Sequence, residues 1–109
     1  MMVITLDSLA HDIEDFLAFK RALGYSYRRG EATLRSFERF AYEHAGRGSK
    51  GRSKIGLATT LEAFLSRLEG RKAVTAANEL GALRQLCLYR RRRDSYEQVR
   101  FLLEHLGIG

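Results

Sequence analysis

Apolar residues along this chain recur mostly three or four positions apart, which is the spacing of one face of an α-helix. No stretch alternates apolar and polar residues for long enough to predict a strand, and the chain contains no proline. The pattern predicts helices over residues 8–23, 27–45, 60–69, 75–92 and 96–106. We therefore expect an all-α fold, a compact bundle of four to five short helices in a single domain over residues 1–109.

Polar caps and glycines predict where these helices begin and end. Gly24 and Gly46 follow the first two helices, as expected of residues that readily adopt the conformation closing a helix. The expected N-terminal caps carry a side-chain oxygen: Asp7 or Ser8, Ser26, Thr59, Thr75 and Ser95. Thr59 and Ser95 each precede a Glu or Gln by three residues, the spacing of a capping box.

The apolar faces of the helices predict the core. Its expected members on the first three helices are Leu9, Ile13, Phe16, Leu17, Leu34, Phe37, Phe40, Ala41, Leu61, Phe64, Leu65 and Leu68. The fourth helix is apolar on most sides from Leu80 to Tyr89, so we expect it in the middle of the bundle. Gly81 lowers helix propensity there by about 1 kcal/mol, which predicts close approach of a neighbouring backbone.

Charge is unevenly distributed along the chain. The net charge is +6, made up of −2 over residues 1–27, +10 over 28–93 and −2 over 94–109. Such a basic middle is typical of proteins with a polyanionic partner, and charge alone fits a solvated arginine-rich surface equally well. On the second helix, Arg35 and Arg39 each lie within about 20° of Arg28 around the helix axis, opposite the core-facing side.

The segment 46–56 is predicted to be a flexible basic loop. It holds four glycines, four cations and no acid. A plain connector does not need four cations, so phosphate contact is slightly favoured over the connector interpretation. Its glycines do not match the pattern of a nucleotide-binding P-loop.

Side-chain sets for catalysis or metal binding are missing from the sequence pattern. The three histidines lie in separate predicted helices, and Asp12, Glu14 and Asp15 are interpreted as complements of the first helix dipole. The single cysteine, Cys87, cannot form an internal disulfide and is expected to be a buried, inert thiol. We expect no catalytic activity, metal or cofactor. With neither a membrane-spanning run nor a signal-peptide pattern, a reducing cytoplasm is the expected compartment.

Three segments, taken in order, resemble the N-terminal core-binding (SAM-like) domain of the tyrosine recombinase, or phage integrase, family. The first covers 13–43 and contains Thr33-Leu34-Arg35-Ser36-Phe37, which is similar to a T-L-x-x-F centre of the second family helix. The second, TTLEAFLSRL, covers 59–68. The third covers 75–94 and contains the run LGALRQL, similar to an L-x-A-L-R-x-[LF] pattern.

The resemblance implies a helical bundle that grips one face of duplex DNA, while a separate domain cuts it. That second domain carries an Arg, Lys, His and Tyr catalytic set, for which these 109 residues leave no room. The chain is therefore expected to bind DNA without catalysis, as an excised domain or a stand-alone protein, in DNA recombination or integration by a mobile genetic element. When bound to DNA it would be associated with the nucleoid.

The family's second and fourth helices cross the major groove, which implies DNA contacts for particular residues here. The candidates on those helices are Ser26, Arg28, Arg29, Ala32, Arg35, Arg39, Lys72, Thr75, Asn78 and Gln85, and the basic loop adds Lys50, Arg52 and Lys54. Arginines would take phosphates or guanine edges, and Asn78 could read adenine. For the run Arg90–Arg93, phosphate contact and a complement to the helix dipole remain equally good interpretations.

A helical protein-interaction module is the alternative. The expected fifth helix carries an apolar stripe that a four-helix core need not cover: Tyr96, Val99, Leu103 and Leu106. This stripe predicts a homodimer through the C-terminal helix.

Overall fold

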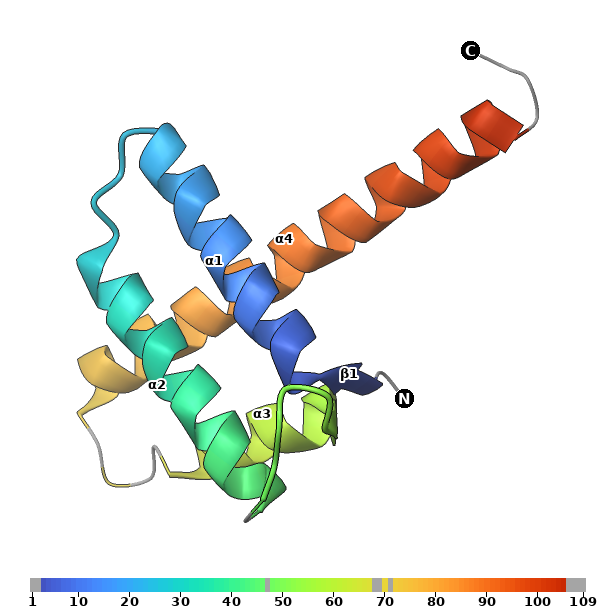
Figure 1. Cartoon of the computed structure of the whole chain (residues 1–109). Coiled ribbons are helices and arrows are strands. Elements are labelled where there is room, and N and C mark those ends of the chain that lie inside the picture. Colours follow the sequence, from blue (N-terminus) through green and yellow to red (C-terminus); the bar gives the residue numbers. More distant parts are fainter. Residues whose placement is uncertain (1–2, 47, 68–69, 71, 106–109) are drawn as a thin grey trace.

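A computed structural model shows a mostly helical chain with one small antiparallel sheet (Figure 1). It describes residues 3–46, 48–67, 70 and 72–105, and only the backbone from residue 95 onward. In this part of the chain the elements are β1 Val3–Thr5, α1 Leu6–Ala22, α2 Arg28–Ala45, β2 Lys54–Gly56, α3 Leu57–Ser66 and α4 Ala73–His105. Helices α1 and α2 lie side by side and run in opposite directions, and α4 crosses behind both. The all-α class is confirmed.

Helix α4 is one continuous helix, where the sequence predicted two helices separated near residue 94. The predicted capping box at Ser95 is therefore wrong, because a Ser with Gln three residues later also fits within a helix when no Gly or Pro interrupts it. The C-terminal part of α4 extends beyond the other three helices (Figure 1).

The sequence did not predict the two strands. Strands β1 and β2 pair with Ile4 opposite Ile55, and each is only three residues long, too short for an alternating pattern to identify. Beyond the pair, the backbone N–H groups of Leu6 and Asp7 donate to the carbonyls of Ser53 and Gly51, at 3.0 and 2.8 Å. The second half of the basic loop is thereby attached to the start of α1.

Several helix starts also differ from the predictions. Thr5, not Asp7 or Ser8, caps α1 and accepts a hydrogen bond from the Ser8 N–H at 3.1 Å. Helix α3 begins at Leu57 with Gly56 as its cap, rather than at Thr60 with Thr59 as its cap, and α4 begins two residues before Thr75. A polar residue inside the first turn resembles a cap in sequence, so the true start can lie one turn earlier.

The glycine stops of the first two helices are confirmed. Helix α1 ends at Ala22 and is followed by Gly24, whose φ of +91° is favourable only for glycine. Helix α2 ends at Ala45, with Gly46 as its C-terminal cap at φ +104°.

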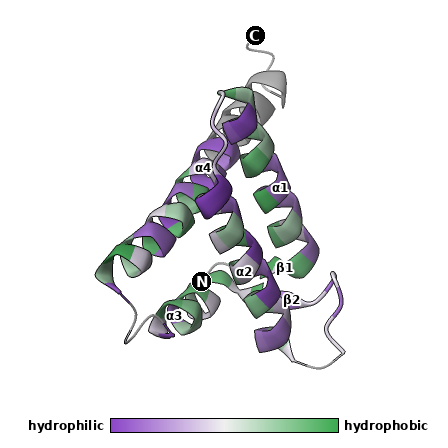
Figure 2. Cartoon of the chain, turned by 90° about the vertical axis from the view of Figure 1, so that its left-hand side faces the viewer, coloured by the Kyte–Doolittle hydropathy of each residue, from purple (hydrophilic) through white to green (hydrophobic). Residues whose placement is uncertain are grey.

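The core lies where α1, α2, α3 and the middle of α4 meet (Figure 2). Eight predicted core residues are buried: Leu9, Ile13, Phe16, Leu17, Leu34, Phe37, Ala41 and Phe64. The rings of Phe37 and Phe64 meet edge to face, with centroids 5.2 Å apart, and join α2 to α3. The small sheet adds Ile4 and Ile55, which the sequence analysis missed.

Helix α4 contributes one face to this core and does not lie in its middle. Leu83 and Leu86 are buried, whereas Leu80 and Leu88 are 51% and 41% exposed. The predicted close approach at Gly81 is also wrong, because a Cβ there would meet nothing within 4 Å. A helix with apolar residues on several sides can expose some of them, so this pattern alone does not show burial.

A buried charge cluster fixes α1 against α4. Asp12 is 2% exposed and Arg90 is 7% exposed. The Arg90 Nε donates to Asp12 Oδ2 at 2.5 Å, and Arg93 donates to the other carboxylate oxygen. The interpretation of Asp12 as a dipole complement is therefore wrong. A signal existed in the sequence, because Asp12 lies three residues after Leu9 and four before Phe16, on the buried face.

Candidate nucleic-acid interface

Tyr27 organises the start of α2 and connects it to two other helices. Its backbone is left-handed, with φ +49°, and it caps the helix through its carbonyl rather than its side chain. The ring meets Phe16 of α1 edge to face at 5.7 Å, and the hydroxyl donates to Gln85 Oε1 of α4 at 3.3 Å. Burial raises the pKa of Tyr27. The predicted cap, Ser26, lies one residue before the observed N-cap.

Gly30 leaves the space that the Tyr27 ring occupies. A Cβ at this position would lie 2.2 Å from Tyr27 Cε2, well inside contact distance. The ring can lie over the first turn of α2 only because residue 30 has no side chain. Glycine here thus serves the placement of Tyr27 and, through it, the bond to Gln85.

The start of α2 and the N-terminal half of α4 enclose a surface hollow of about 560 Å³, here named the α2–α4 hollow. Its lining residues are Ser26, Tyr27, Arg28, Arg29, Gly30, Ala77, Asn78, Gly81, Ala82 and Gln85. Five of these are candidates from the sequence, and all five are exposed: Ser26, Arg28, Arg29, Asn78 and Gln85. Residues that are far apart in the chain are therefore brought to one surface.

The α2–α4 hollow is electropositive. None of the ten described residues that line it is Asp or Glu. Within the described part of the chain, Arg28 and Arg29 form no ion pair with a carboxylate. The nearby Glu31 pairs instead with Arg21 of α1. The hollow thus combines two arginines of α2 with the side-chain amides of Asn78 and Gln85 of α4.

The three arginines predicted to share one face of α2 have different surroundings in the structure. Arg35 forms an ion pair with Glu14 of α1, and its Nη1 lies 3.6 Å from Oε2 of Glu38 on the same helix. The hydrogen bond to Glu14 raises the pKa of Arg35, and the same bond lowers the pKa of Glu14. Arg39 is exposed, as is Ala32. Of the three arginines predicted to share a face, only Arg28 lines the α2–α4 hollow.

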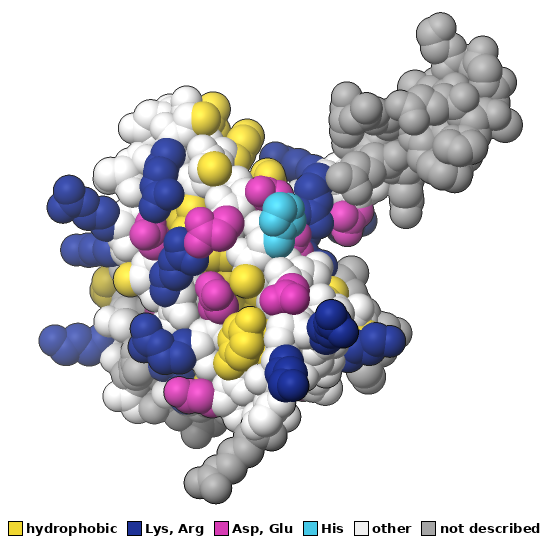
Figure 3. Space-filling view, in the orientation of Figure 1, with side chains coloured by type: hydrophobic (Ala, Val, Ile, Leu, Met, Phe, Trp, Pro, Cys, Tyr) yellow, Lys and Arg dark blue, Asp and Glu magenta, His cyan; other side chains and the backbone are white. Residues whose placement is uncertain are grey.

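The remaining candidates lie outside the hollow. Lys72 and Thr75 are exposed at the start of α4, and neither lines it. Lys50, Arg52 and Lys54 belong to the segment that follows the other end of α2 (Figure 1). Figure 3 shows Lys and Arg side chains along the left edge and again at the lower right, with acidic side chains between them. The structure does not gather the basic loop and the α2–α4 hollow into one patch.

The four consecutive arginines near residue 90 do not end a helix. Arg90 and Arg93 bind Asp12, while Arg91 and Arg92 are exposed. Because α4 continues to His105, the interpretation of this run as a complement to a helix end is wrong. The hydrogen bond to Asp12 raises the pKa of Arg93.

Cys87 is half-buried, and desolvation raises the pKa of its thiol. Among the described residues, no group of three or more His, Cys, Asp or Glu is placed to hold a metal ion, and no helix combines the length and apolar character needed to cross a membrane. The stripe predicted to form a dimer lies outside the described side chains: Tyr96, Val99, Leu103 and Leu106.

Comparison with known proteins gives no relative for this chain: no family model, no curated protein and no solved structure matches it.

Proposed function

We propose that this chain is a duplex DNA-binding module of the integrase core-binding type and that it contacts DNA through the α2–α4 hollow. The observation that carries the proposal is the convergence of Arg28 and Arg29 with Asn78 and Gln85. The sequence resemblance implies DNA contacts on the same two helices.

The chemistry of the hollow fits a nucleic acid. Guanidinium groups on one wall can take phosphate oxygens or the O6 and N7 of guanine. The Asn78 amide on the other wall has the donor and acceptor that match adenine N6 and N7. Backbone N–H groups at the start of α2 favour a phosphate in the same place.

Tyr27 and Gly30 position this surface. The Tyr27 side chain connects the start of α2 to Gln85 of α4 by a hydrogen bond. The absence of a side chain at Gly30 leaves space for the Tyr27 ring. Such preorganisation reduces the entropy cost when the two walls bind a ligand together. In this proposal the chain holds DNA, and none of its residues performs a bond-breaking step.

Charge reversal tests the proposal. We expect Arg28→Glu/Arg29→Glu to weaken binding to a fluorescent duplex of about 20 base pairs by at least about tenfold, measured by anisotropy at low salt. The matched control is Arg84→Glu/Arg91→Glu, which changes the net charge equally at two exposed arginines outside the hollow. Equal losses of affinity in the two variants would show diffuse charge attraction and contradict a defined site.

A further inference from the structure

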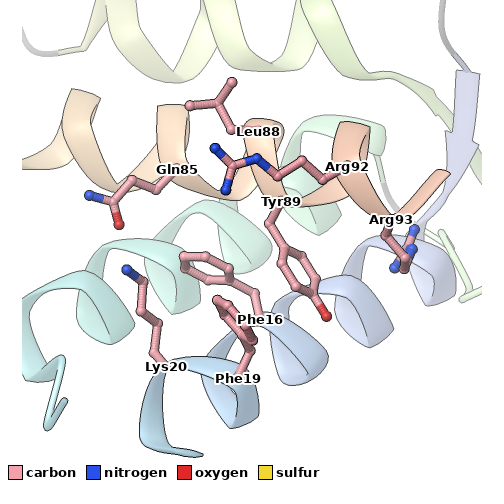
Figure 4. Close-up of a pocket in the computed structure, with 8 residues that line it drawn as sticks. All are labelled: Phe16, Phe19, Lys20, Gln85, Leu88, Tyr89, Arg92 and Arg93. Atoms are coloured by element: carbon pink, nitrogen blue, oxygen red, sulfur yellow. The ribbon is translucent and has the colours of Figure 1, made fainter. Parts of the chain in front are cut away.

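A second hollow, of about 530 Å³, lies between α1 and α4 (Figure 4), and it is named here the α1–α4 groove. Its lining residues are Phe16, Phe19, Lys20, Gln85, Leu88, Tyr89, Arg92 and Arg93. Aromatic rings form its floor, with the centroid of Tyr89 lying 5.4 Å from those of both Phe16 and Phe19. Gln85 lines both hollows and so lies on the ridge between them.

Large apolar side chains in this groove are open to solvent. Phe19 is 45% exposed and Leu88 is 41% exposed, and they come from facing helices. Apolar surface gathered in a concave site is characteristic of places where a partner binds. Neither side chain is needed to fill the core, which other residues of α1 and α4 already form.

The rim of the groove is cationic. Lys20 Nζ lies 5.7 Å from the Phe16 ring centroid, and the side chain of Arg92 is directed over the floor from α4 (Figure 4). Arg93 is held by Asp12 and Asp94. No Asp or Glu occurs among the described residues that line the groove. An occupant that combines an apolar group with negative charge would therefore match both floor and rim.

We propose that the α1–α4 groove docks a short acidic segment of a partner protein, which inserts one large apolar side chain against Phe19 and Leu88 and places carboxylates near Lys20 and Arg92. The groove spans α4 from Gln85 to Arg93, about 12 Å at the helical rise per residue. That length accommodates several consecutive residues of a segment.

Duplex DNA is the less suitable occupant of this groove. Its exposed surface is phosphate, sugar and base edge, and its largest apolar group there is the thymine methyl. DNA would leave Phe19 and Leu88 without an apolar partner. The proposal is independent of DNA binding at the α2–α4 hollow.

The experiment begins with selection from a displayed library of random peptides of about 12 residues against the full chain. We expect enrichment of sequences with Phe, Trp or Leu flanked by Asp or Glu. The enriched peptide, labelled with fluorescein, is then titrated by anisotropy. Leu88→Asp and Arg92→Glu should each weaken its binding by at least about tenfold. The matched control, Arg91→Glu, reverses a neighbouring exposed charge outside the groove and should change binding less than about twofold.

The proposal would be overturned if no sequence were enriched, if the enriched sequences lacked acidic residues, or if Arg91→Glu and Arg92→Glu weakened peptide binding equally. A change of oligomeric state in Leu88→Asp would also overturn it and would assign the groove to a second copy of the chain. A DNA defect in Arg92→Glu as large as that of Arg28→Glu/Arg29→Glu would assign it to nucleic acid instead. Because Leu88 and Arg92 are both exposed, circular dichroism should show unchanged helix content in both variants, and Arg92→Glu alone suffices if Leu88→Asp does not fold.

Discussion

Asp12 illustrates how one buried side chain can hold two helices together. Its carboxylate accepts hydrogen bonds from Arg90 and Arg93, whose positions lie about eighty residues further along the chain. A buried ion pair contributes little net stability compared with an apolar pair, but removing one partner leaves the other charge buried without compensation.

We therefore expect Asp12→Asn to lower the free energy of unfolding by about 3–5 kcal/mol, because Arg90 and Arg93 both lose a buried charged acceptor of their hydrogen bonds. Urea denaturation measures the change. A small effect on stability would show that Asp12 is not a buried anchor.

Cys87 should react slowly with thiol reagents. Burial raises the pKa of its thiol, so the thiolate fraction at any pH below that pKa is smaller than for an unhindered cysteine. The rate of iodoacetamide alkylation should rise with pH and its midpoint should lie above that of a short cysteine peptide. A midpoint below that of the peptide would contradict the partial burial of the thiol.

At the scale of elements, the first turn of α2 depends on two residues that must be considered together. Tyr27 adopts a left-handed backbone and covers the turn with its ring, and Gly30 allows the ring to approach. A glycine in a helix normally lowers stability by about 1 kcal/mol relative to alanine, and at residue 30 the Tyr27 ring occupies the space that a Cβ would need.

The glycines of α2 and α4 should respond oppositely to alanine. Gly81→Ala should raise the free energy of unfolding by about 0.5–1 kcal/mol, since its Cβ meets open space. Gly30→Ala should lower it, because the new methyl group displaces the Tyr27 ring. In the background of Tyr27→Ala, the same change at residue 30 should become neutral or stabilising. Denaturant unfolding of the four variants measures this cycle, and a stabilising Gly30→Ala in the wild-type background would disprove the contact.

The continuity of α4 has its own test. If residue 95 capped a separate helix, Ser95→Ala would cost about 0.5–2 kcal/mol of helix stability. Because the backbone is helical from Ala73 to His105, we expect Ser95→Ala to keep or slightly raise the helical signal in circular dichroism. A clear loss of helical signal would restore the two-helix prediction.

These elements also show which parts of the fold local patterns can predict. The periodic apolar positions of α1 and α2 identified Phe16, Phe37 and their neighbours as core, because burial of one helix face leaves a regular trace in sequence. Strands of three residues leave no such trace. The partner of Asp12 depends on how α1 crosses α4, which no local pattern contains.

At the scale of the whole molecule, the chain presents a polar basic hollow and an aromatic groove on either side of Gln85. Of the thirteen DNA-binding candidates, the structure brings five together in the α2–α4 hollow, whereas Arg35 is held by Glu14 and Glu38. The sequence pattern could predict which residue types are DNA-binding candidates and which helix faces carry them. That these residues meet in one hollow depends on how α2 crosses α4, which the sequence pattern does not contain. The ion pair of Arg35 with Glu14 likewise depends on how α1 packs against α2.

The salt dependence of DNA binding tests the central claim most directly. For six phosphate contacts, log K should fall with log[salt] at a slope of about −5. Replacing Arg28 and Arg29 with Gln should reduce the magnitude of that slope by about 0.9 for each phosphate that the variant no longer neutralises. A slope that stays unchanged in this variant, or an absence of binding at low salt by the folded wild-type chain, would contradict the assignment of the α2–α4 hollow as a DNA-binding surface.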